Sequence, residues 1–566
     1  MRSTPSQKLG GAARNADPKE RVRAALATIA LVVVVVLVGA PLVGWPPVVR
    51  LPVVVAPALV LALLVVRPWR WRETELRALD RWEPRGRVVL FAALIAGLVL
   101  FWLVLTRFQS GAINAVDFTV YFDRPCFQTL QGRPLYVETA DAPGFSHRSE
   151  LAVHAYWGML PVCSVYALYP SPLWLLALSV IAVVAGGVHV RRIMQRIGAG
   201  GALASATALA FILNDNTARA LNYGFHPEVL FAWFVPWMID AALRRQRRSF
   251  SVAMLACALV KEDAVMPIFA ASVALGLHAF RRMTWSDRLL FLFLPTAVAA
   301  ANLGIYYGYV VPKLTDAGTP TYAHFWANYG ATPMLALVGM LTQPWRVLVS
   351  TMTSGFWTTV IVPHLFLPVL GWRWVVGIVP IVALYGASAN EQLRAFGIYY
   401  AIVLGPFLAI AASAGALTLF RRLVANAGHA RLAAAAAIFL GALLVGSGDR
   451  GYSLRPWKSE VAAVPEALDR LANEPVVLVQ SGLYPHAGYD ERVQLLTPET
   501  LEDARDTRAV VLLAPDVSAY PFDPSDLADL TLLRPLRAMP PGILAVRLPE
   551  AHTRSWEPQP PQRPRQ

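Results

Sequence analysis

Long apolar segments separated by arginine-rich turns dominate this sequence. Residues 24–44 and 88–106 contain no charged side chain and are long enough to cross a bilayer. Hydrophobic runs of this kind predict about 13 membrane spans. The expected spans are residues 24–44, 51–66, 88–106, 171–190, 199–213, 227–243, 250–261, 264–280, 289–311, 347–370, 374–389, 395–420 and 432–447. The pattern therefore predicts an all-α polytopic membrane protein.

The basic turns predict the orientation of these spans, because positive residues favour the cytoplasmic side. With a cytoplasmic N-terminus, the predicted spans place every basic turn inside, at residues 67–72, 191–196, 244–248, 281–288, 373 and 421–422. Residues 249–280 decide much of this topology. Two antiparallel arms, rather than one long helix, keep both flanking arginine pairs inside and place Lys261-Glu262-Asp263 at the outer tip.

The apolar runs stop near Asp449, and shorter elements follow. The patterns predict a helix at 464–473 and strands at 476–480, 509–513 and 542–548. We expect five parts along the chain: a disordered cytoplasmic N-terminus at 1–23, two extra membrane helices with a basic loop at 24–87, a membrane core at 88–448, an extracytoplasmic α/β tail at 449–552 and a disordered C-terminus at 553–566.

Composition excludes several classes of protein. Of the 566 residues, 56% are hydrophobic and only 15% are charged, which excludes a soluble enzyme, a disordered protein and a secreted disulfide scaffold. The net charge of +14 comes mostly from arginines at the ends of apolar segments, so we expect no nucleic-acid partner. The three cysteines lack metal-binding spacing, and the sequence does not decide whether Cys126 and Cys163 form a disulfide.

The first outer loop carries two candidate catalytic carboxylates, Asp117 and Asp123. A carboxylate near the outer interface can accept a proton from a sugar or lipid hydroxyl, as a general base does. The competing interpretation is a solvated loop aspartate or a helix cap. Asp123 is the reserve base. The two together could hold a divalent cation, although their spacing is not diagnostic.

A second candidate region precedes the span at 227–243. Pro227 suits the first turn of a helix, and the free N–H groups of such a turn favour an anion such as phosphate. His226 could donate a hydrogen bond to that anion, and Glu228 could orient a partner. Simple helix capping with an interfacial histidine is the alternative.

The third candidate is the charged triplet Lys261, Glu262 and Asp263. Ionisable groups at membrane depth are costly and are usually functional or mutually paired. Lys261 could act as a point charge for phosphate, or the triplet could only neutralise itself. Arg394 and Tyr400 give a weaker signal as residues that close the substrate site.

Familiar cofactor motifs are missing. The sequence has no Walker A motif, no GxGxxG motif between a strand and a helix, no HExxH motif and no nucleophile elbow. ATP hydrolysis, dinucleotide redox chemistry and zinc-protease chemistry are therefore not expected. We expect no cofactor, with a divalent cation as the one open alternative.

Several of these motifs together carry a resemblance to a known family. The loop at 117–121 with 132–136, then Phe-His-Pro-Glu at 225–228 and Lys-Glu-Asp at 261–263, resembles a family of bacterial multi-spanning membrane proteins of unknown function. That family is similar to the GT-C glycosyltransferases, which take a sugar from a polyprenyl-phosphate donor. The resemblance covers residues 88–500. Family members often have a His-Tyr pair where this chain has Tyr399-Tyr400, a departure that bears on the substrate.

The resemblance implies a function and a location. It implies a GT-C-like core in the bacterial plasma membrane, with Asp117 as the base of an extracytoplasmic site. The implied reaction moves a sugar from a polyprenyl-phosphate donor to a hydroxyl of a cell-envelope glycan or glycoprotein. Two alternatives stay open. A transporter or lipid flippase would be favoured by internal repeats and broken helices, which the sequence does not show. A non-catalytic membrane assembly protein of the same fold would look much the same.

Overall fold

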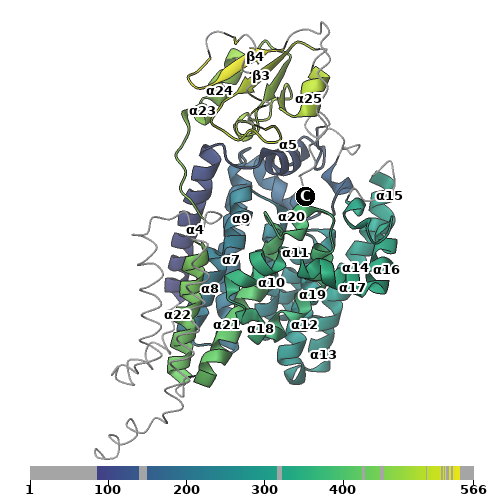
Figure 1. Cartoon of the computed structure of the whole chain (residues 1–566), viewed down its shortest axis with the longest axis vertical. Helices are drawn as coiled ribbons and strands as arrows, with labels where there is room; N and C mark the ends of the chain where they lie inside the picture. The colour runs from purple at the N-terminus through teal and green to yellow at the C-terminus, as the bar shows by residue number, and fades with distance from the viewer. Residues whose placement is uncertain are drawn as a thin grey trace, which may run out of the picture.

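The computed structural model describes residues 86–138, 149–314, 322–423, 427–446, 452–504, 507–523 and 539–548, with a few positions between 524 and 538. It is mostly helical and has a small sheet near the C-terminal end of the chain. The helices run roughly along the long axis, and the sheet lies at one end of them (Figure 1). This arrangement agrees with the predicted helical protein with a small α/β tail.

The helices of the bundle begin at α4 and end at α22. Short 3-10 and π-helical turns interrupt many of them. The bounds are α4 (Gly86–Gln109), α5 (Arg124–Leu130), α6 (Met159–Cys163), α7 (Leu173–Arg196), α8 (Gly201–Leu213), α9 (Asp215–Tyr223), α10 (Phe231–Leu243), α11 (Arg247–Ala258), α12 (Val265–Ala279), α13 (Trp285–Arg288), α14 (Leu294–Ile305), α15 (Val311–Leu314), α16 (Pro333–Thr342), α17 (Pro344–Met352), α18 (Leu367–Leu370), α19 (Val379–Gly386), α20 (Glu391–Arg394), α21 (Gly405–Leu423) and α22 (Ala427–Gly446).

The described helices include five that are long and apolar enough to cross a membrane. They cover Arg87–Gln109, Leu173–Arg196, Glu262–Arg282, Trp285–Leu314 and Tyr400–Leu423. Further apolar helices are shorter, among them Gly201–Leu213 and Val376–Gly386. The expected spans at 24–44 and 51–66 lie outside the described residues, so the total of about 13 spans stays a prediction.

Residues 247–282 fold back on themselves, as the two-arm interpretation of this segment predicts. Helix α11 packs against α12, and the chain turns at Lys261 between them. The two ends of the hairpin meet, because Arg245 Nη2 donates to the Arg282 carbonyl oxygen at 2.5 Å and Arg247 Nη2 lies 3.1 Å from Asp287 Oδ1. Both basic ends therefore lie together, next to α13, at the end of the molecule opposite the sheet (Figure 1).

The tail contains a four-stranded sheet in the order β2-β1-β3-β4. Its strands are β1 (Val476–Val479), β2 (Val493–Leu495), β3 (Ala509–Leu513) and β4 (Leu544–Arg547), with helices α23 (Ser459–Ala462), α24 (Val464–Arg470) and α25 (Pro498–Asp503). Strand β1 pairs in parallel with β2 and β3, and β4 pairs antiparallel with β3. The fully buried strand β3 is a continuous apolar run, as expected for the centre of a covered sheet.

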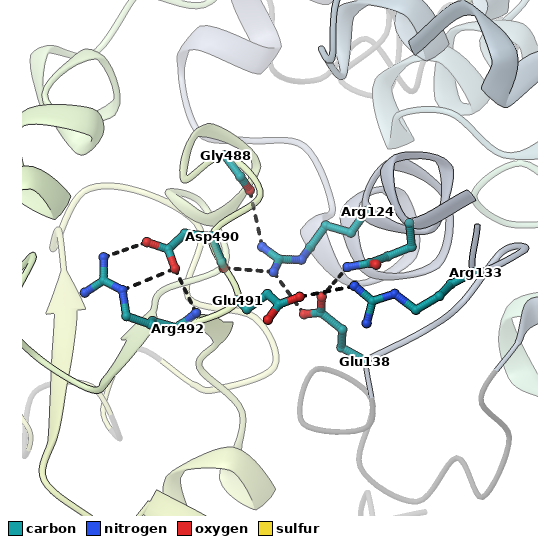
Figure 2. Close-up of polar contacts among 8 residues, drawn as sticks. Arg124, Arg133, Glu138, Gly488, Asp490, Glu491 and Arg492 are labelled. Atoms are coloured by element: carbon teal, nitrogen blue, oxygen red, sulfur yellow. Dashed lines mark hydrogen bonds and ion pairs between the residues drawn. The ribbon is translucent and has the colours of Figure 1, made fainter. Parts of the chain in front are cut away.

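The tail is docked on the C-terminal end of α4 and on the loop that follows it. Gly111 has a φ of +65°, and a Cβ there would lie 2.8 Å from the carbonyl oxygen of Gly482. A larger residue would push the tail away, so glycine permits this close backbone approach. Nearby, Arg124 donates to the carbonyl oxygens of Gly488 and Asp490 at 3.2 and 3.1 Å (Figure 2).

A disulfide closes the same loop. Cys126 of α5 is bonded to Cys163 of α6, 37 residues later. The sequence left this pairing undecided. The bond fixes α5 against α6 and so holds the segment that leads into the tail contacts.

Candidate functional site

One large cavity, of about 340 Å³, lies between the segment that follows α4 and the turns at His226 and Lys261 in the helical bundle. Its polar lining comes from distant parts of the chain. The ionisable and tyrosine side chains in that lining are Asp117, Tyr121, Glu150, His154, Tyr156, His226, Lys261, Glu262, Asp263, Tyr307, Tyr322, Tyr385, Tyr399 and Tyr400. The structure thus brings three of the predicted regions to one cavity.

Asp117 reaches this cavity from a π-helical turn, η2 (Val116–Asp123). Asn114 fixes the start of the turn, since its Oδ1 accepts hydrogen bonds from the backbone N–H groups of residues 116 and 117 at 3.0 and 3.3 Å. The hydroxyl of Tyr223 donates to Asp117 Oδ2. Gly224, with a φ of +115°, lets the turn after α9 press against η2, because a Cβ there would lie 3.1 Å from Phe118 Cβ.

His226, Glu228 and Lys261 form a hydrogen-bonded row beside Asp117. Nδ1 of His226 hydrogen-bonds Oε2 of Glu228, and Lys261 Nζ donates to Glu228 Oε1 at 2.6 Å. The histidine ring also stacks on Tyr399, with ring centroids 3.6 Å apart. His226 has extended backbone angles and Pro227 opens the following turn, η5 (Pro227–Leu230), as the residue preferences before and at a proline predict.

Glu262 is satisfied by partners from another segment. Its Oε1 lies 2.7 Å from His154 Nδ1, and its Oε2 accepts a hydrogen bond from the backbone N–H of Ala155 at 2.9 Å. Asp263 Oδ2 is 3.9 Å from Lys261 Nζ, while its Oδ1 has no hydrogen-bond partner. Lys261 is therefore paired mainly with Glu228 and only loosely with its own neighbour Asp263.

Asp123 and Arg394 are placed away from the cavity lining. Asp123 Oδ1 accepts hydrogen bonds from Tyr166 Oη at 2.7 Å and from Tyr489 Oη of the tail at 2.9 Å. Arg394 Nη2 donates to Thr353 Oγ1 at 2.9 Å. Tyr400, in contrast, lines the cavity.

Burial controls the acidity of the carboxyl groups in the segments between α4 and α7. It raises the pKa of Asp117 to about 7, with a further contribution from the charge of Glu228. It also raises the pKa of Glu150 to about 8, to which the charge of Asp117 adds. For Asp123, burial outweighs the hydrogen bonds from Tyr166 and Tyr489, so that its pKa rises to about 6. Asp117 and Glu150 can therefore take up or release a proton near neutral pH.

Two lining residues, Glu150 and His154, did not stand out in the sequence. Both precede the expected span at 171–190: Glu150 opens η3 (Glu150–Ala152), and His154 follows it. The sequence signal for Glu150 was only that of a charged residue between two predicted outer segments. No spacing in the sequence indicated that it lies near Lys261 or Asp117. The described residues contain no group of three or more His, Cys, Asp or Glu side chains that could hold a metal ion.

A family model matches residues 107–514 of the chain, which is more than half of its length. The family is described as "Predicted membrane protein (DUF2079)". The chain belongs to this DUF2079 family. The match confirms the family expected from the motifs and spans both the membrane core and most of the tail. No curated protein matches the chain.

Solved structures of two glycosyltransferases are similar to this DUF2079 protein at low identity. ArnT from Cupriavidus metallidurans bound to undecaprenyl phosphate is 14% identical, with a TM-score of 0.46, 82% of this chain covered and 98% of that chain covered. Its apo state is 13% identical, with a TM-score of 0.43 and the same coverage. Arabinofuranosyltransferase AftD from Mycobacteria is 15% identical, with a TM-score of 0.42, and the matched region is 83% of this chain but 40% of AftD. ArnT and AftD are GT-C glycosyltransferases.

Proposed function

We propose that this protein is a membrane glycosyltransferase. It would move a sugar from a polyprenyl-phosphate donor to a hydroxyl of a cell-envelope glycan or glycoprotein outside the bacterial plasma membrane. The observation that carries the proposal is the placement of Asp117. Its carboxylate lines a cavity of about 340 Å³, next to a buried lysine and a histidine. The motif resemblance to GT-C enzymes supplies the class of donor.

Asp117 would act as the general base. Tyr223 holds one carboxylate oxygen, which fixes the orientation of the group and leaves the other oxygen for an acceptor hydroxyl. With a pKa of about 7, the carboxylate is basic enough to accept a proton and is ionised in a large fraction of molecules at neutral pH. The acceptor oxygen would attack the anomeric carbon as its proton moves to Asp117.

Lys261 and His226 would stabilise the phosphate that leaves. Both line the same cavity and are joined through Glu228, which lies between them. A phosphate gains negative charge as its bond to the sugar breaks, so a fixed ammonium group contributes most in the transition state. Because Lys261 also neutralises Glu228, its charge is shared between a structural and a catalytic role.

The location proposed for this site is outside the cytoplasm. Disulfides form and persist in oxidising compartments, and the Cys126–Cys163 bond lies in the segment that follows η2. This supports an extracytoplasmic first outer loop, an extracytoplasmic tail docked on that loop and a cytoplasmic N-terminus.

Replacement of Asp117 by asparagine tests the proposal. Asparagine keeps the size and accepts the Tyr223 hydrogen bond but cannot take up a proton. Transfer from a polyprenyl-phosphate sugar, measured as release of polyprenyl phosphate by the purified protein in nanodiscs, should fall about 10²–10⁴-fold in Asp117→Asn. Asp123→Asn is the matched control, because Asp123 does not line the cavity, and it should keep most of the activity.

Two outcomes would contradict this assignment. Full activity of Asp117→Asn with loss of activity in Asp123→Asn would move the base to Asp123. Movement of the lipid across the bilayer by the wild-type protein, with no release of polyprenyl phosphate, would instead favour a transporter or flippase.

A further inference from the structure

Acidic side chains outnumber basic side chains around the cavity. Among the described residues that line it, one lysine faces four carboxyl groups, those of Asp117, Glu150, Glu262 and Asp263. The lysine already has an ionic partner, because Lys261 Nζ lies 2.6 Å from Oε1 of Glu228. Glu228 is a fifth carboxyl group, and it is not part of the cavity lining. Even with both lining histidines counted as basic groups, the carboxyl groups outnumber them, and burial keeps Asp117 partly and Glu150 largely protonated at neutral pH. A phosphate-bearing donor entering alone would add more negative charge to this poorly screened space, which is unfavourable.

Glu150 is the least compensated of these carboxylates. It is 3% exposed, and its Oε1 is buried without any hydrogen-bond partner. Glu262, in comparison, has a partner on each oxygen. Buried polar atoms without partners are rare in folded proteins, because each one loses its hydration without compensation. An unpartnered carboxyl group on a cavity wall therefore indicates a ligand with a hydrogen-bond donor, and a positively charged donor would also favour the ionised form of Glu150.

The aromatic residues near Glu150 favour an organic cation over a metal ion. Tyr322 lines the same cavity as Glu150 and Asp117, and its ring stacks on His154 at a centroid distance of 5.0 Å. Aromatic faces next to carboxylates attract ammonium groups. A metal ion held by the protein would need several side-chain ligands, and no group of three is present in the described part of the chain.

We propose that this cavity binds a substrate with an ammonium group, which Glu150 receives as its ionic partner. This inference rests on the proposed glycosyl transfer and adds the chemical class of one substrate to it: an amino sugar or an acceptor that carries an amine. In this arrangement Lys261 faces the phosphate, Glu150 faces the ammonium group, and Asp117 stays available for the hydroxyl proton. The positive charge of the substrate then offsets a carboxylate that the protein leaves unpaired.

The test compares sugars that differ at one position. Purified protein in nanodiscs is titrated by calorimetry with glucosamine, glucose and N-acetylglucosamine, of which only the first has an ammonium group. We expect glucosamine to bind about 10–100-fold more tightly than the two neutral sugars, the range for one charge-assisted hydrogen bond. Equal binding of the three sugars, or no binding of glucosamine, would overturn the inference. This measurement needs only the wild-type protein.

Two variants assign the preference to a residue. Glu150→Gln keeps the shape of the side chain and removes its charge, so it should bind glucosamine and glucose equally. Its melting temperature should not fall, because the replaced oxygen has no partner to lose. Glu491→Gln removes an exposed carboxylate of the tail and should keep the wild-type preference. A preference that survives in Glu150→Gln would contradict the role of this residue.

A second arm identifies which substrate carries the amine. The titration is repeated with the protein saturated by a polyprenyl-phosphate donor that carries mannose, a neutral sugar. If the ammonium group belongs to the donor sugar, mannose occupies its place and glucosamine binding is lost; if it belongs to the acceptor, binding is kept. These binding preferences are read without turnover, so a failure of the transfer reaction and a failure of this inference are separate results.

Discussion

At the scale of single residues, the chemistry of the cavity depends on which carboxyl groups are ionised. Glu150 is buried and Asp117 is partly buried; the charge of Asp117 adds to the raised pKa of Glu150, and the charge of Glu228 adds to that of Asp117. Lys261 lowers the pKa of Glu150, which opposes the effect of burial. Small changes of pH near neutrality therefore change the charge of the cavity.

A pH profile of the proposed transfer follows from Asp117. A general base works only in its ionised form, so activity should be low at pH 5.5, rise about tenfold per pH unit below the pKa of about 7, and level off above it. Initial rates between pH 5.5 and 9 in nanodiscs measure this profile. Asp117→Asn should show a low and flat profile over the rising limb. A wild-type profile that falls with increasing pH over this range would exclude a carboxylate base with this pKa.

Sequence reasoning reached part of this residue-level arrangement. Asp117, His226 and Lys261 were candidates because each is a polar residue next to an apolar span, and the fold brings all three to one cavity. Glu150 and His154 were missed because their importance comes from contacts over long distances in the chain, such as the 108 residues between His154 and Glu262. The pairing of Lys261 with Glu228 was missed for the same reason, since each residue has acidic or basic neighbours that are closer in sequence.

At the scale of elements, the important unit is η2 with α5, which the tail holds in place. Arg124 of α5 lies at the centre of this contact, where Nη2 is 2.9 Å from Glu138 Oε2 and the guanidinium also donates to two carbonyl oxygens of the tail (Figure 2). Phe127 stacks on Tyr489 with a centroid distance of 4.4 Å. The same short segment carries Asp117 at its beginning, so the tail contacts restrict how far the proposed base can move.

Two arginines of this region form a matched pair for a stability experiment. The Arg124–Glu138 pair is buried, with side chains 4% and 17% exposed, whereas the Arg133–Glu491 pair is 43% and 74% exposed (Figure 2). Removing one partner of a buried pair costs about 3–5 kcal/mol, and breaking an exposed pair costs about 0–1 kcal/mol. Arg124→Met should therefore lower the melting temperature of the purified protein clearly, and Arg133→Met should leave it nearly unchanged.

Hydrogen exchange tells whether the loss is local. In Arg124→Met, peptides that cover residues 112–130 and 480–492 should exchange faster than in the wild-type protein, while peptides of α7 and α21 should not change. If these peptides exchanged equally fast in Arg124→Met and Arg133→Met, the contacts of Arg124 with the tail would not hold this loop.

The elements themselves were predictable to different degrees. Long apolar runs such as α4 and α7, and the buried strands β1 and β3, follow directly from the hydrophobic pattern. Strand β2 has only three residues, too few for a period-2 pattern to stand out, and it forms because it can add to the edge of β1. The π-helical turn η2 also has no clear sequence signal, although Asn114 caps its first N–H groups.

At the scale of the whole molecule, the sheet and the basic turns lie at opposite ends of the bundle (Figure 1). Arg245 and Arg247 meet Arg282 and Asp287 near α13, far along the long axis from the tail. The positive-inside preference assigns this basic end to the cytoplasm. The disulfide at the other end agrees with an oxidising compartment on that side.

Reporter fusions test this orientation. Fusions after Arg196, Arg248, Arg282 and Arg422 should all report the cytoplasm, because each of these arginines lies in a basic turn that the predicted topology places on the cytoplasmic side. A fusion after Asp449 should report the outside, since the tail docks on the loop that carries Asp117. Alkaline phosphatase and green fluorescent protein fusions at each position give complementary signals. Opposite sides for the fusions after Arg248 and Arg282 would contradict the hairpin around Lys261.

The docking of the tail on the segment that follows α4 has a consequence for biogenesis. Synthesis and membrane insertion proceed from the N-terminus, so α4, η2 and α5 are in place long before Tyr489 and Gly488 are made. During that interval Asp123 and Arg124 lack the tail partners that they have in the finished protein. Chains that stop early can insert their helices but leave this loop without its last contacts. Maturation of the cavity is thereby tied to the end of translation.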